Sequence, residues 1–244
     1  MAIKEIEDLN IKKGLEFVDK LRSEKNRYQF WETLDPDIDH KIWSQSQYLA
    51  FVLFTVIGME KEAKHIQENN DFNAPAGDRE GRANDRFCVL IDDSESFAYK
   101  RISAEAKDGH ADSIALMGMY SLVKERRGSR LTRWLQRRKN GMDSHASVDR
   151  LRAMYDQEKG FLIESGEIAE LYKLSLLGIL AKKIGNREWV DTIDNRLRET
   201  QSNNGGWKSH WIGRTEPRPI GTTENLETTA LSIIALYLSL NRWK

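Results

Sequence analysis

Four positions near the starts of four apolar segments carry side chains that could bind a ligand or transfer a proton. When the segments are aligned, these positions fall in one column: Gln45, Asp112, Tyr172 and Glu227. Glu227 could act with His210 as an acid–base pair, and Asp112 is a third candidate for a catalytic group. Carboxylates are also common in the first turn of a helix, where they stabilise free backbone N–H groups. Catalysis and helix capping are therefore both open for the two carboxylates.

Tryptophan and glutamate residues beside this column extend the candidate ligand site. Trp43 stands just before one apolar segment, Trp211 lies in the loop before another, and Glu224 begins that second segment. The indole rings could stack on a sugar or line an apolar pocket, or they could fill the junctions between helices. The residues that we expect to contact a ligand are Trp43, Gln45, Asp112, Tyr172, Trp211, Glu224 and Glu227.

The four apolar segments are predicted helices that other parts of the chain must enclose. They cover residues 44–58, 110–123, 167–184 and 224–240 and are apolar almost all round. Less apolar helices are predicted over 3–22, 60–69, 96–107, 148–154 and 189–200. Residues 70–86 are expected to form a loop, and residues 87–91 either a strand or a helical turn.

The apolar helices repeat one pattern along the chain. Residues 172–186 align with 227–241 without a gap, and 45–59 and 112–126 fit the same frame, with Gly118 opposite Gly178. Such self-similarity is typical of arrays of helix pairs. We predict one all-α domain over residues 1–244, with helical hairpins at roughly 3–59, 60–123, 129–186 and 187–241. Its apolar helices would form an inner ring, complete or incomplete, with their N-termini at one rim.

Two glycine turns resemble those of a known superfamily. Gln201-Ser-Asn-Asn-Gly205-Gly206-Trp207 fits the Gln-x-x-x-Gly-x-Trp signature of squalene and oxidosqualene cyclases. Gln157-Glu-Lys-Gly160-Phe161 is similar to a turn of protein prenyltransferase β-subunits. The resemblance covers residues 145–241 and, more loosely, 10–130. It implies an α/α toroid whose inner helices surround a cavity, and hence a hydrophobic or polyprenyl-type ligand in that cavity.

The catalytic motifs of that superfamily are not present. Asp35-Pro-Asp-Ile-Asp39 differs from the Asp-x-Asp-Asp motif of the cyclases, and Asp92-Asp93-Ser-Glu-Ser96 differs from the Asp-Asp-x-x-Asp motif of terpene synthases. Cys88 does not stand in the context of the prenyltransferase zinc ligand. We therefore expect a divergent member with no metal and no cofactor, and the sequence leaves open whether it is an enzyme.

Two other classes of function fit parts of the sequence. The Asn-Gly-Gly-Trp turn also resembles that of a pectate lyase family with a helical toroid, and this favours a carbohydrate-active lyase or hydrolase that binds a glycan. The basic segment 124–139 could instead make the protein a helical-repeat interaction module. A solvated outer helix face is the simpler interpretation of that segment.

Composition, charge and apolar runs limit the classes of binding partner and the cellular location that we expect for the protein. Lys plus Arg equals Asp plus Glu, at 38 each, so net charge favours neither nucleic acid nor an anionic membrane. The longest apolar run, residues 48–59, is too short to span a bilayer, and the N-terminus lacks the pattern of a signal peptide. The single cysteine, Cys88, lies among apolar residues and is expected to be buried. We expect a cytoplasmic protein without a transmembrane segment.

Overall fold

The computed structural model describes residues 6–37, 41–72, 75–76, 79–82, 86–92, 99–127, 143–157, 160–162, 169–211 and 223–240. Within these ranges the chain is mostly helical, and its strands are two to four residues long. The prediction of an all-α protein is confirmed.

The helices follow the predicted order, and most of their ends lie close to the predicted ones. They are α1 (Leu9–Lys20), α2 (Ser44–Val56), α3 (Glu60–Glu68), the 3-10 helix η2 (Cys88–Ile91), α4 (Tyr99–Asp108), α5 (Ala111–Arg127), α7 (Ser144–Ala153), α8 (Leu171–Ile184), α9 (Arg187–Glu199) and α10 (Leu226–Leu240). Residues 87–91, for which a strand was one alternative, are thus mostly a helical turn. The basic segment 124–139 lies largely outside the described residues.

Short antiparallel strand pairs join some of these helices. β1 (Pro75–Ala76) pairs with β2 (Arg79–Arg82), β3 (Tyr155–Asp156) with β4 (Phe161–Leu162), and β5 (Ala169–Glu170) with β6 (His210–Trp211). The region 70–86 was expected to be a loop and contains the first of these pairs. Strands this short produce no detectable hydrophobic period in a sequence.

The start of α1 differs from the prediction because an aspartate caps the helix. Asp8 Oδ1 accepts the backbone N–H groups of Asn10 at 3.0 Å and Ile11 at 3.1 Å. The helix therefore begins at Leu9 rather than at residue 3. The isoleucines upstream of Asp8 continue the apolar pattern, but a side chain that satisfies the first free N–H groups fixes the helix start.

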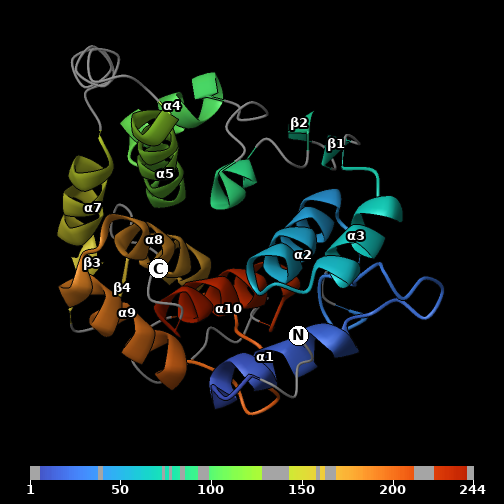
Figure 1. Cartoon of the computed structure of the whole chain (residues 1–244). Helices are drawn as coiled ribbons and strands as arrows, with labels where there is room; N and C mark the ends of the chain where they lie inside the picture. The colour runs from blue at the N-terminus through green and yellow to red at the C-terminus, as the bar shows by residue number, and fades with distance from the viewer. Residues whose placement is uncertain are drawn as a thin grey trace.

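The four apolar helices pack side by side in an order that differs from their order in the chain. α2 packs on α10, α10 on α8, and α8 on α5, so the first and last of them are neighbours (Figure 1). The less apolar helices cover this row: α3 packs on α2, α1 on α10, α9 on α8 and α10, α7 on α5 and α8, and α4 on α5. This order encloses the apolar helices, as their composition requires.

Two glycines let the apolar helices approach their neighbours closely. A Cβ atom on Gly118 of α5 would lie 2.7 Å from Leu180 Cδ2 of α8 and 2.8 Å from Ser147 Cβ of α7. A Cβ atom on Gly178 of α8 would lie 3.0 Å from Ile193 Cγ2 of α9. Each glycine thus faces the next outer helix in the chain, which is the equivalence that the sequence alignment predicts.

The Gly-Gly-Trp turn fastens α9 and α10 to α1. The Trp207 side chain is fully buried; its indole N–H donates to Leu197 O at 2.7 Å, and its backbone N–H donates to Thr229 Oγ1 at 3.0 Å. Gly205 has φ +97°, and a Cβ atom there would lie 2.3 Å from Lys13 O. Trp207 therefore braces the turn and has no surface left for a ligand.

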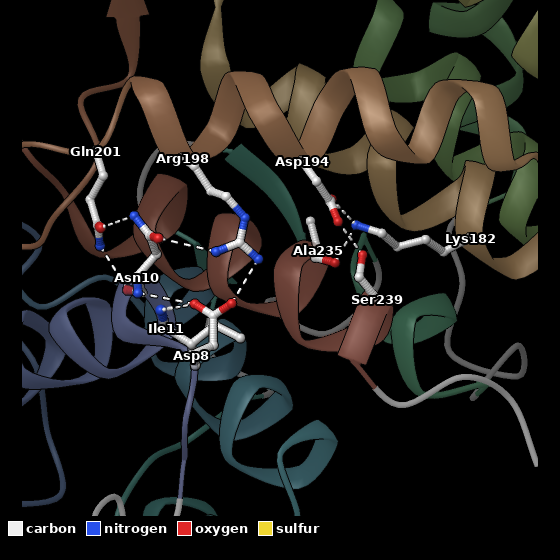
Figure 2. Close-up of polar contacts among 9 residues, drawn as sticks. All are labelled: Asp8, Asn10, Ile11, Lys182, Asp194, Arg198, Gln201, Ala235 and Ser239. Carbon is white, nitrogen blue, oxygen red and sulfur yellow. Dashed lines mark hydrogen bonds and ion pairs between the residues drawn. The ribbon is translucent and has the colours of Figure 1, made fainter.

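A buried lysine connects three helices near the C-terminal end of α8 (Figure 2). The ammonium group of Lys182 contacts Asp194 of α9 and donates to the carbonyl oxygen of Ala235 in α10. The Ser239 hydroxyl donates to the other oxygen of Asp194. Burial lowers the pKa of Lys182 below its ordinary value, and Asp194 partly opposes that effect. The contacts hold α8, α9 and α10 together at this end.

A second polar cluster joins α1 to the C-terminal end of α9 (Figure 2). Arg198 Nη2 pairs with Asp8 Oδ2 at 2.7 Å, and Arg198 Nη1 donates to Asn10 Oδ1 at 3.1 Å. Asn10 Nδ2 donates to Gln201 Oε1 at 2.7 Å, and Gln201 Nε2 donates to Asn10 O at 2.8 Å. Gln201 thus links the glycine turn to the N-terminal helix.

Candidate functional site

The N-terminal ends of the four apolar helices meet in one group of polar side chains. Gln45 Nε2 of α2 donates to Glu227 Oε1 of α10 at 3.3 Å. The Tyr172 hydroxyl of α8 donates to Asp112 Oδ2 of α5 at 3.4 Å, which is a long and weak hydrogen bond. We call Gln45, Asp112, Tyr172 and Glu227, together with Glu32, Arg86 and Glu170, the rim cluster.

The contacts of the rim cluster follow the packing order of the helices. The Gln45–Glu227 pair connects α2 to α10, and the Tyr172–Asp112 pair connects α8 to α5. Between α8 and α10, the negative charge of Glu227 raises the pKa of Tyr172. The N-termini of all four helices therefore point to one side of the molecule. The column predicted from the alignment is a real spatial group.

Tyr172 is a hydrogen-bond donor at neutral pH. Burial raises the pKa of its hydroxyl above the ordinary value, and the negative charges of Glu170 and Glu227 raise that pKa further, whereas Arg86 lowers it. A phenol in this environment stays protonated, so Tyr172 can donate a hydrogen bond but cannot act as a general base.

Asp112 is buried and forms an ion pair with a residue that the sequence did not single out. Its Oδ2 atom contacts the guanidinium of Arg86, and its Oδ1 atom accepts the backbone N–H of Ser113 at 2.7 Å. Only 6% of Asp112 is exposed. Asp112 thus accepts a backbone N–H in the first turn of α5 and contacts both Arg86 and Tyr172, while its contact with a ligand stays a prediction.

Glu32 is a second rim residue that the sequence did not indicate. Its Oε1 atom accepts the Glu227 N–H at 3.3 Å, its carbonyl oxygen accepts the Leu226 N–H at 2.9 Å, and its other carboxylate oxygen accepts the Ser46 hydroxyl. Glu32 therefore holds the start of α10 against α2. It lies in an irregular segment, where no periodic pattern marks a residue as important.

Of the remaining predicted contact residues, Trp43 and Glu224 have described side chains, whereas Trp211 does not. Trp43 directly precedes α2 and is half-buried, with Lys41 Nζ 5.2 Å from its ring. Glu224 pairs with Lys208 through a backbone bridge next to the Gly-Gly-Trp turn. The backbones of His210 and Trp211 pair with β5 just before α8, but their side chains are not among those described. The His210–Glu227 pair stays a prediction.

Carboxylates predominate in this group. Glu32, Asp112, Glu170 and Glu227 contribute carboxylates, while Arg86 pairs with Asp112 and Lys173 with Glu170. The helix N-termini attract anions through their free N–H groups, but these carboxylates oppose that attraction. Among the described rim side chains the balance favours neutral hydroxyl groups or cations over a diphosphate.

Neither a candidate metal-binding cluster nor a candidate membrane-spanning helix occurs within the described residues. No group of three or more His, Cys, Asp or Glu side chains there is arranged to hold a metal ion. Over the same ranges, no helix has both the length and the apolar character needed to cross a bilayer. Comparison with known proteins adds no assignment, since no protein-family model, curated protein or solved structure matches this chain.

Proposed function

We propose that this protein binds a small ligand that has an apolar body and an uncharged polar end, as a divergent α/α toroid of the terpenoid cyclase and prenyltransferase type. The observation that carries the proposal is the rim cluster, which spans the N-terminal ends of four helices whose middle turns are mainly apolar. A polar rim next to apolar helices matches a ligand with one polar end and a hydrocarbon body.

The charges at the rim support an alcohol as the polar end. Tyr172 supplies a protonated hydroxyl, Gln45 supplies an amide, and Glu227 supplies a carboxylate acceptor within 3.3 Å of that amide. A ligand hydroxyl can both donate to Glu227 and accept from Tyr172. A diphosphate can only accept and carries negative charge toward the carboxylates, so its binding is disfavoured there.

A carbohydrate-active enzyme is the second candidate, because the same side chains suit a sugar. A protonated phenol close to carboxylates can donate to glycan hydroxyls or to a leaving oxygen, and a half-buried tryptophan, Trp43, can stack on a pyranose face. The third class, a helical-repeat interaction module, depends on the basic segment 124–139, and the described residues give it no support.

A binding comparison separates these functions. The wild-type protein is titrated calorimetrically with farnesol, with farnesyl diphosphate and with an oligogalacturonide. We expect farnesol to bind more tightly than its diphosphate. Tighter binding of the diphosphate would overturn the proposed polar end. Binding of the oligosaccharide without binding of farnesol would replace the first function by the second.

Two conservative variants connect binding to the rim. Tyr172→Phe and Glu227→Gln each remove one hydrogen-bonding or charged group and are expected to weaken farnesol binding about 3- to 10-fold. Tyr28→Phe, which alters a tyrosine stacked on His65, and Glu199→Gln, which alters an exposed glutamate of α9, are the matched controls. Equal effects of rim and control variants would exclude the rim as the binding site.

A further inference from the structure

We infer that residues 86–92, here called the closing strap, complete a ring by joining the two ends of the row of apolar helices. The row α2–α10–α8–α5 has α2 at one end and α5 at the other. The 3-10 helix η2 packs against both α5 and α2, and it is the green turn between these helices in Figure 1. The closing strap thus occupies the position that a further inner helix would take.

The closing strap is docked through its apolar residues. Phe87, Cys88 and Val89 are completely buried, and Leu90 is nearly so. A connection on the surface does not need to bury four apolar side chains. Their burial requires apolar neighbours on both sides of the strap. The helices α2 and α5 provide those neighbours.

An ion pair fixes each end of the closing strap. At its start, Arg86 pairs with Asp112 in the first turn of α5, where the rim cluster lies. At its end, Asp92 Oδ1 lies 3.2 Å from Lys183 Nζ, in the last turn of α8. The strap therefore runs in the same direction as the apolar helices, from their N-terminal to their C-terminal ends.

Asp92 also shapes the end of the closing strap through its backbone. It has φ +61° and is the only described residue other than glycine with a positive φ, and it terminates η2 in the left-handed conformation. Aspartate adopts this conformation more readily than most residues. Asp92, the first residue of the segment that resembles an incomplete terpene synthase motif, therefore has a structural role.

Docking of the closing strap also completes the rim cluster, because Arg86 belongs to both. When the strap is docked, Arg86 supplies a cation next to Asp112 and Tyr172. When it is undocked, the rim loses that cation and the side of the ring between α5 and α2 opens. This inference does not depend on the identity of the ligand.

Cys88 reports on this docking, because it is buried in the closing strap and is the only cysteine of the chain. The rate at which Ellman's reagent labels Cys88 is measured without denaturant. We expect slow labelling in the wild type and about fivefold faster labelling in Lys183→Met, in Asp92→Asn and in Arg86→Met, the change expected from one partly buried ion pair.

The combination of variants tests the two anchors separately. Lys183→Met with Asp92→Asn should label no faster than either single variant, because both remove the same ion pair. Lys183→Met with Arg86→Met should show the product of the two effects, about 25-fold. Arg152→Met removes an exposed ion pair with Glu188 far from the strap and should leave the rate unchanged.

Global unfolding is the competing explanation for faster labelling. Lys182→Met weakens the contacts among α8, α9 and α10 without touching the closing strap, so its global stability falls while its Cys88 rate should change little. The inference is overturned if labelling follows global stability in every variant. It is also overturned if wild-type Cys88 reacts as fast as in the urea-unfolded chain.

Discussion

Alanine substitutions at the two aligned glycines test the packing of apolar helices against outer helices. In Gly118→Ala, the new Cβ atom would lie 2.7 Å from Leu180 Cδ2 and 2.8 Å from Ser147 Cβ. In Gly178→Ala, the closest atom would be Ile193 Cγ2 at 3.0 Å. Both glycines lie inside helices, so both substitutions also gain helix propensity.

The two effects can be weighed against each other. Overpacking costs about 1–3 kcal/mol, and replacing a helical glycine by alanine gains about 0.8–1.0 kcal/mol. Ser147 Cβ is fixed to the backbone of α7 and cannot rotate away, so Gly118→Ala should lose about 1–2 kcal/mol of unfolding free energy. Ile193 Cγ2 can move by a few tenths of an ångström, so Gly178→Ala should be close to neutral.

Urea unfolding followed by far-UV circular dichroism measures both variants under the same conditions. The m-value should stay constant, so the shift in midpoint reports stability alone. If Gly118→Ala is neutral or stabilising, or if Gly178→Ala is the more destabilising of the two, the close approach of α5 to α7 and α8 is wrong.

Two further predictions concern the polar clusters around α9. Lys182→Met leaves Asp194 buried beside Ser239 and should destabilise the protein by about 3 kcal/mol in urea unfolding. The double variant Lys182→Met with Asp194→Leu should recover part of that loss. A loss in the double variant that equals the sum of the two single losses would contradict this coupling. Burial raises the pKa of Asp8, but Arg198 and two backbone N–H groups outweigh burial, and the pKa is lowered overall. The Asp8 carboxylate therefore stabilises the fold at pH values above its ordinary pKa of 3.8. This stabilisation is lost as pH falls through the lower pKa of the folded state. Asp8→Asn should therefore be less stable than the wild type at pH 7 and approach it in acid, and an unchanged difference across that range would refute the assignment.

The helices and the column at their N-termini could be predicted because both depend on a repeated pattern. Aligned apolar segments predicted α2, α8 and α10 with ends within a few residues of those observed. The same alignment placed Gln45, Asp112, Tyr172 and Glu227 in one column. The structure brings Gln45 within hydrogen-bonding distance of Glu227, and Tyr172 within that distance of Asp112. A repeat fixes equivalent positions in space even when the residues at them differ.

The other rim residues could not be predicted because they lie outside the repeat. Glu32 and Arg86 come from irregular connections, and their positions depend on the tertiary contacts of those connections. The packing of α1 on α10 and of η2 between α5 and α2 also joins segments that are distant in the chain. Hydrophobic periodicity describes the face that a helix buries but does not identify the helix that covers it.

The structure of the protein with farnesol bound would test the proposed ligand site most directly. We expect the hydroxyl oxygen of farnesol to lie within hydrogen-bonding distance of the Tyr172 hydroxyl or the Glu227 carboxylate, with the isoprenoid chain against the apolar helices. A farnesol molecule bound elsewhere, or bound with its hydroxyl pointing away from the rim cluster, would contradict the proposed function.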